Sequence, residues 1–171
     1  MYLCTKISHN MKKILFVCHG NICRSPMAEM IMKKMVADRN LADAFEIASA
    51  ATSTEEIGND IYPPAKDCLR HHNIPFTRRR ARQMTVADYN YYDHIFVMDD
   101  NNLRFLHWSM PDIVVDAGHG KFYDPNGKIQ KLMSLTGSDA SVADPWYTDN
   151  FERTYNDICE ALEYLFLLLD F

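Results

Sequence analysis

The chain has no excess of positive charge. Its 171 residues include 18 lysines and arginines against 23 aspartates and glutamates, which gives a formal net charge of −5 at neutral pH. Proteins that bind nucleic acids hold the phosphate backbone with surplus lysine and arginine. The composition therefore argues against DNA or RNA as a partner.

Long apolar runs are also missing. The runs "ILFVC" at 14–18 and "LFLLL" at 165–169 each contain only a few residues. A signal-peptide core needs about 7–15 apolar residues, and a membrane-spanning helix needs about 20. We therefore expect a soluble, cytoplasmic protein without a membrane partner.

The cysteines lack the paired spacing of a zinc site or of a secreted disulfide framework. They are odd in number and scattered along the chain: Cys4, Cys18, Cys23, Cys68 and Cys159. This pattern predicts free thiols in a reducing compartment and no metal site.

The chain does contain enough apolar material for a core, since 47% of its residues are hydrophobic. Its length fits one domain, which we predict over residues 12–171. Residues 1–11 show neither helical nor strand periodicity, and they are predicted to form a disordered N-terminal extension.

Buried, β-favouring runs alternate with amphipathic segments. Strands are predicted at 13–17, 44–49, 93–99 and 112–116, and helices at 26–40, 63–72, 101–106 and 150–169. The region 117–144 is rich in glycine and proline and is predicted to be loop, with one short helix at 128–135. The alternation predicts the α/β class, with a doubly wound, four-stranded parallel sheet flanked by helices. Ligands of such sheets bind beyond the carboxyl ends of the strands, where Cys18 lies.

The segment "CHGNICR" at 18–24 joins the first strand to a helix. Backbone amides in such a loop can converge on an anion, and Gly20 and Asn21 tolerate the positive φ angles of a tight turn. Arg24 can donate two hydrogen bonds to a tetrahedral oxyanion. We therefore predict a phosphate-binding loop after the first strand.

The same positive potential favours the thiolate form of Cys18, which is the nucleophilic form. Ser25 can donate a hydrogen bond to this sulfur and make it a better leaving group. A single cysteine after a strand is often only a small buried residue. A Cys-x5-Arg-Ser frame between a strand and a helix instead favours an anion-binding nucleophile.

Three segments resemble the low-molecular-weight protein tyrosine phosphatases: "VCHGNICRSP" at 17–26, "ARQMTVADYNYYDHIFVMD" at 81–99 and "DPW" at 144–146. The likeness extends from about residue 12 to the C-terminus, with an apparent insertion around 118–127. This resemblance implies hydrolysis of a phosphomonoester, most often phosphotyrosine in a protein, without metal or cofactor.

The resemblance also implies the roles of the catalytic residues. Cys18 would form a phosphocysteine, and Arg24 would hold the phosphoryl oxygens. Asp144 would protonate the leaving phenol and then activate water. Asp124, which also precedes a proline, competes for this role, but the aromatic residues of "DPWY" favour Asp144.

Further roles follow from the same resemblance. Asn21, Ser49 and His72 match positions that brace the loop, although His72 could equally be a solvated helix residue. Cys23 matches a cysteine that can form a reversible disulfide with Cys18, or it could be a small packed residue.

The remaining loop positions, His19, Gly20 and Ile22, are expected to surround the phosphate. Glu55, Trp146 and Tyr147 are expected to form the substrate wall. The basic segment "TRRRAR" at 77–82 is expected to be solvated or ion-paired surface. The expected partner is a tyrosine-phosphorylated protein or a small aryl phosphate, bound by a monomer or weak dimer.

Two other functions are compatible with the loop. A thiol-dependent arsenate reductase would use the same anion site but would need further cysteines within reach. A phosphotyrosine-binding module would keep the pocket without turnover.

Overall fold

The computed structural model describes residues 10–171. The predicted N-terminal extension lies outside the described residues as far as residue 9, and so does Cys4. Asn10 and Met11 are exposed and lead directly into the first strand.

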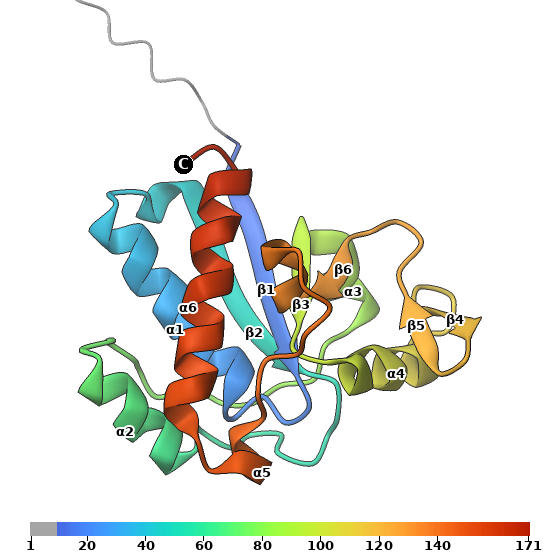
Figure 1. Cartoon of the computed structure of the whole chain (residues 1–171), viewed down its shortest axis with the longest axis horizontal. Coiled ribbons are helices and arrows are strands. Elements are labelled where there is room, and N and C mark those ends of the chain that lie inside the picture. The colour runs from blue at the N-terminus through green and yellow to red at the C-terminus, as the bar shows by residue number, and fades with distance from the viewer. Residues whose placement is uncertain (1–9) are drawn as a thin grey trace, which may run out of the picture.

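A four-stranded parallel sheet forms the centre of the fold (Figure 1). Its strand order is β2-β1-β3-β6, and its strands are β1 (Lys12–Cys18), β2 (Phe45–Ala51), β3 (His94–Val97) and β6 (Ile129–Lys131). Both neighbours of β1 run parallel to it. A central parallel strand is covered on both faces, which explains why the middle of β1 is continuously apolar and buried.

Helices cover both faces of the sheet, as a doubly wound fold requires. One core layer packs alternate residues of the strands, such as Ile14 and Phe16, beneath α1 (Arg24–Asp38), α2 (Pro63–His71) and α6 (Phe151–Leu168). The other layer packs Leu15 and Val17 against α3 (Val86–Tyr91) and α4 (Asp100–Ser109). The two short helical segments before β2 and after β6 are η1 (Ala42–Ala44) and η2 (Leu132–Thr136).

The prediction of a four-stranded parallel sheet is confirmed, but its fourth strand does not lie at 112–116, where Val115 and Asp116 begin a strand of a separate antiparallel pair. The apolar residues there end a turn after α4, in which Val114 is fully buried and its amide donates to the carbonyl of Met110. The fourth strand is β6, within the segment predicted to be a short helix. β6 has only three residues, too few to give an apolar pattern.

The apparent insertion forms a small antiparallel pair of β4 (Val115–Gly118) and β5 (Lys121–Tyr123), which projects beside α4 (Figure 1). It is attached to α4 by contact between the rings of His107 and Phe122, whose centroids lie 5.0 Å apart. Within the described part of the chain, no helix is both long and apolar enough to cross a membrane.

Asp124 organises the chain between β5 and β6. Its buried carboxylate accepts hydrogen bonds from the Tyr89 hydroxyl at 3.0 and 3.1 Å. It also accepts from the backbone amides of Asn126, Lys128 and Ile129 at 2.9–3.0 Å. A buried carboxylate with this many donors holds the turn that places β6 at the sheet edge.

We predict that Asp124→Ala lowers the free energy of unfolding by roughly 2–4 kcal/mol, because it leaves several buried donors without an acceptor. Urea unfolding would measure the change. Asp112→Ala removes an exposed carboxylate nearby and should change stability by less than about 0.5 kcal/mol. Equal effects of the two substitutions would contradict the role given to Asp124.

Candidate active site

The loop after β1 turns sharply into α1 at the carboxyl end of the sheet. Asn21 adopts a positive φ of 59°, which asparagine tolerates better than most residues. A Cβ atom at Gly20 would lie 3.2 Å from Cγ of Glu56, so glycine lets the neighbouring loop approach. In the described part of the chain, the amides of Gly20, Ile22 and Cys23 donate to no protein acceptor. They are available to an anion.

The sulfur of Cys18 lies at the base of this loop. It is 3.1 Å from Oγ of Ser25 and accepts a hydrogen bond from the Ser25 amide at 3.4 Å. The Ser25 hydroxyl itself accepts from Nδ2 of Asn21 at 2.8 Å. The Ser25 hydroxyl donates its own hydrogen to the carbonyl of Ala50 at 3.3 Å, and the Cys18 thiol donates to the Ser25 oxygen.

Asn21 is the centre of the network that braces the loop. Its side-chain amide also donates to Oγ of Ser49 at 2.9 Å, and Ser49 donates to Glu29. Its side-chain oxygen accepts from the Arg79 guanidinium and from the Arg82 amide. The structure thus brings together Asn21 and Ser49, the two residues that the resemblance implies as braces of the loop.

Arg24 is almost fully buried and points into the site between two carboxylates. Nη1 lies 2.6 Å from Oδ2 of Asp99, and Nη2 lies 3.0 Å from Oδ2 of Asp144. Burial disfavours its charge, but the negative charges of Cys18, Asp99 and Asp144 outweigh burial and raise the pKa of Arg24. The guanidinium is therefore a fixed cation beside the sulfur.

Asp144 lies at the entrance of the site, partly exposed, immediately before α5 (Pro145–Thr148). Its backbone is extended, as expected for a residue before proline. One carboxylate oxygen caps α5 by accepting from the Trp146 amide at 3.1 Å, while the other meets Arg24. The carboxyl group is thereby directed across the mouth of the loop.

These residues border a pocket of about 420 Å³. Its lining includes Cys18, Cys23, Arg24, Glu55, Glu56, Asp99, Phe105, Asp144, Trp146 and Tyr147. The rim is aromatic and acidic. Tyr147 is 85% exposed, Trp146 packs against Tyr62, and the predicted wall residue Glu55 forms an ion pair of 2.9 Å with His19.

The second cysteine of the loop differs from the first in its surroundings. Burial, together with the charges of Cys18 and Asp144, raises the pKa of Cys23 to about 12. Cys23 is thus an uncharged thiol at neutral pH. All four described cysteines are free.

The residues named in two of the alternatives differ in their position relative to the pocket. The Asp124 carboxylate accepts hydrogen bonds from Tyr89 and from the turn between β5 and β6, and it does not border the pocket. Asp144 does border the pocket. An arsenate reductase would need further cysteines within reach of its anion site; Cys68 and Cys159, among the described residues, do not border the pocket.

His72 is placed away from the loop. Its Nε2 meets Glu152 at 2.8 and 3.0 Å, and its ring stacks on Tyr155. Among the described residues it has no hydrogen bond to the phosphate loop. The brace expected from His72 comes instead from Arg79, whose Nη1 donates to the Asn21 carbonyl at 2.6 Å.

Arg79 and Asp99 are among the site residues that the sequence did not assign. Arg79 lies within the basic segment expected to be surface, and nothing local shows that this arginine turns inward. Asp99 could have been found, because it follows β3, and the carboxyl ends of neighbouring parallel strands meet at one edge.

Comparisons with known proteins agree with this arrangement. A family model described as low molecular weight phosphotyrosine protein phosphatase matches residues 13–170. The low molecular weight phosphotyrosine protein phosphatase of Sus scrofa is 48% identical over 95 residues, which are 56% of this chain and 60% of that protein. The chain thus spans somewhat less than two thirds of the length of this relative.

Solved structures align over more of the chain. A low molecular weight protein tyrosine phosphatase from Streptococcus pyogenes is 34% identical with a TM-score of 0.76, covering 93% of each chain. A drosophila arginine phosphatase is 30% identical with a TM-score of 0.77, covering 92% of this chain and 97% of its own. The sheet, the loop after its first strand and the family match over residues 13–170 lead to one conclusion: this chain belongs to the low molecular weight phosphotyrosine protein phosphatase family.

Proposed function

We propose that this protein hydrolyses phosphomonoesters, with phosphotyrosine in proteins as the preferred substrate. The observation that carries this proposal is the position of the Cys18 sulfur. It lies beneath unpaired loop amides, within the field of Arg24 and beside the Ser25 hydroxyl. Amide donors and a cation arranged in this way stabilise a bound phosphoryl group beside the cysteine.

In the first step the Cys18 thiolate attacks phosphorus. A sulfur–phosphorus bond forms as the bond from phosphorus to the phenol oxygen breaks. Arg24 and the loop amides stabilise the charge on the phosphoryl oxygens, and each such donor is worth about 10²–10³ in rate. Asp144, in its protonated form, transfers its proton to the departing oxygen.

In the second step water attacks the phosphocysteine. Asp144, now a carboxylate, takes a proton from the water as the new phosphorus–oxygen bond forms. The sulfur–phosphorus bond breaks, and inorganic phosphate and the Cys18 thiolate are released. The Ser25 hydroxyl stabilises the departing sulfur by a hydrogen bond, which makes it a better leaving group.

The shape of the pocket supports an aryl substrate. Phe105, Trp146 and Tyr147 provide ring surfaces around the anion site, and aromatic side chains pack well on a phenyl group. Glu55 and Glu56 make the rim acidic, so substrates crowded with acidic residues should bind less well.

We further propose that residues 12–171 act as one catalytic domain in the cytoplasm, as a monomer or weak dimer that binds neither nucleic acid nor membrane. The free thiols of the four described cysteines suit a reducing compartment. The acidic composition suits a protein substrate better than a nucleic acid.

The proposal can be tested with p-nitrophenyl phosphate in the presence of a chelator, followed by matched peptides that carry phosphotyrosine, phosphoserine or phosphoarginine. We expect turnover of the aryl phosphate and fastest release of phosphate from phosphotyrosine. Preferential hydrolysis of phosphoarginine or phosphoserine would contradict the substrate assignment. Tight binding of the phosphotyrosine peptide without phosphate release would contradict catalysis.

We predict that Cys18→Ser lowers the turnover of p-nitrophenyl phosphate by about 10³-fold or more, because the nucleophile is lost. Cys23→Ser is the matched control within the same loop. It should retain most of the activity, since Cys23, with a pKa of about 12, is protonated at neutral pH. Steady-state kinetics of the two variants would measure the difference, and substantial activity in Cys18→Ser would rule out the mechanism.

We predict that Asp144→Asn lowers kcat by about 10²–10⁴-fold for phenyl phosphate, whose leaving group needs a proton. The loss should be smaller for p-nitrophenyl phosphate, whose leaving group is more acidic. Asp149→Asn is a suitable control, because Asp149 has a positive φ of 53° that asparagine also tolerates. An equal loss for both substrates would show that Asp144 does not act as the general acid.

A further inference from the structure

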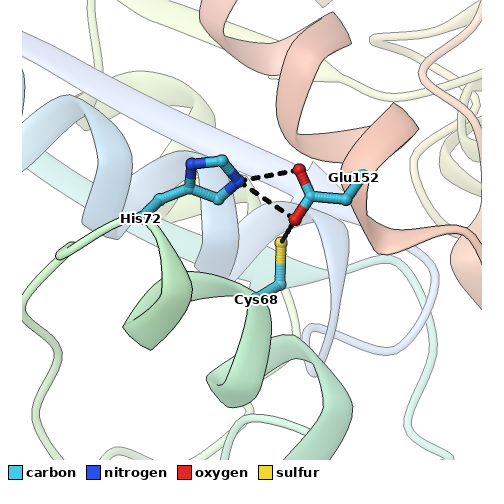
Figure 2. A group of neighbouring side chains, drawn as sticks. All are labelled: Cys68, His72 and Glu152. Atoms are coloured by element: carbon cyan, nitrogen blue, oxygen red, sulfur yellow. Dashed lines mark hydrogen bonds and ion pairs between the residues drawn. The ribbon is translucent and has the colours of Figure 1, made fainter.

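A group of three potential metal ligands lies outside the pocket, where α2 packs beside α6 (Figure 2). Cys68 lies on α2, His72 caps the end of α2, and Glu152 lies in the first turn of α6. None of the three borders the active-site pocket. Their ligand atoms all lie within 4.8 Å of one another.

The spacing of the first two residues is favourable for chelation. Residues four apart on a helix project from the same face, and the His72 amide completes that turn by donating to the Cys68 carbonyl at 3.2 Å. Face-to-face stacking on Tyr155, with ring centroids 3.6 Å apart, fixes the plane of the His72 ring. Nε2 of this ring then points at Glu152 (Figure 2).

The distances approach those of a tetrahedral metal site. Nε2 of His72 lies 2.8 and 3.0 Å from the two carboxylate oxygens, and Sγ of Cys68 lies 3.7 Å from Oε1 of Glu152. A tetrahedral zinc ion with sulfur, nitrogen and oxygen ligands separates these atoms by about 3.3–3.7 Å. All three ligand atoms lie within 4.8 Å of one another, and side-chain rotation would have to bring them to these separations.

The burial of the three residues leaves the group open to a cation from solvent. Cys68 is buried, whereas the side chains of His72 and Glu152 are 25% and 54% exposed, so one side of the group faces solvent. Without a metal, the Cys68 thiol donates toward the Phe151 carbonyl and Oε1 of Glu152, at 3.6 and 3.7 Å. A thiophilic cation can displace its proton, as metal binding to cysteine generally does.

We propose that Cys68, His72 and Glu152 form a binding site for a thiophilic divalent cation, with Zn²⁺ as the best match. Sulfur, imidazole and carboxylate ligands together suit zinc rather than magnesium or calcium. Three protein ligands leave a fourth position for water. Each bound ion releases the Cys68 proton. A neutral His72 with its proton on Nε2 shifts that proton to Nδ1, and only the imidazolium form of His72 releases one.

The position of the site has a structural consequence. Glu152 adjoins Phe151, which packs on Tyr62 beside the phosphate loop. Because Cys68 and His72 belong to α2, a bound ion would join α2 to the start of α6. It should therefore stabilise the fold in proportion to its concentration.

The first test measures Zn²⁺ affinity of the full chain by competition with a chromophoric chelator. Cys18→Ser serves as the parent, because it removes the active-site thiol as a competing ligand. We expect Glu152→Gln and His72→Gln each to weaken binding by more than about tenfold. Glu160→Gln, an exposed position on the same helix, should leave the affinity unchanged. Equal affinity in all of these proteins would overturn the proposal.

The second test uses Co²⁺ as a spectroscopic probe in the same parent. A thiolate-to-cobalt charge-transfer band in the near ultraviolet is expected, and it should disappear in Cys68→Ser. Circular dichroism of the metal-free variant would establish that it is folded. Retention of the band in folded Cys68→Ser, or its absence in the parent, would refute Cys68 as a ligand. Neither test depends on phosphatase activity, so a failure of the proposed function would leave both results intact.

Discussion

The hydrogen bond of the Asn21 side chain to Ser25 is the interaction on which the site depends. It holds the Ser25 hydroxyl in place, and the oxygen of that hydroxyl lies 3.1 Å from the sulfur of Cys18. Asn21 can do this because its backbone adopts a positive φ and its side-chain oxygen is held by Arg79. The turn at Asn21 thereby connects the basic segment at 77–82, through Arg79, to the sulfur of Cys18.

Charge balance within the pocket explains how a buried arginine is tolerated. Burying a guanidinium is costly unless carboxylates and hydrogen-bond acceptors surround it. Asp99 and Asp144 supply that environment for Arg24, and they come from the ends of different segments. Asp99 also caps α4 through a reciprocal pair of hydrogen bonds with Asn102, so its position is fixed by secondary structure. Among the described residues, the Asp144 carboxylate has hydrogen bonds to the Trp146 amide of α5 and to Arg24, an arrangement that suits the general-acid role we propose for it.

Burial and neighbouring charges also distinguish the cysteines. Cys18 lies among amide donors and beside a cation, whereas Cys23 and Cys68 lie in apolar or anionic surroundings that keep them protonated, each with a pKa of about 12. Their sequence neighbours do not reveal this difference. It arises from which groups face each sulfur, and it explains how one chain can combine a proposed nucleophile, a packed thiol and a proposed metal ligand.

The sequence by itself determined the parallel sheet, its main helices and the loop from Cys18 to Ser25, because periodicity and turn chemistry are local properties. It did not locate the fourth strand, since three residues at a sheet edge carry too little apolar pattern, and a buried turn at Val114 gave the same signal as a strand. Only the tertiary structure shows that Asp144 borders the pocket and Asp124 does not. It also shows that Arg79, and not His72, binds the phosphate loop, and that Glu152 lies next to Cys68. These contacts join residues far apart in the chain, and their geometry exists only after the helices have packed on the sheet.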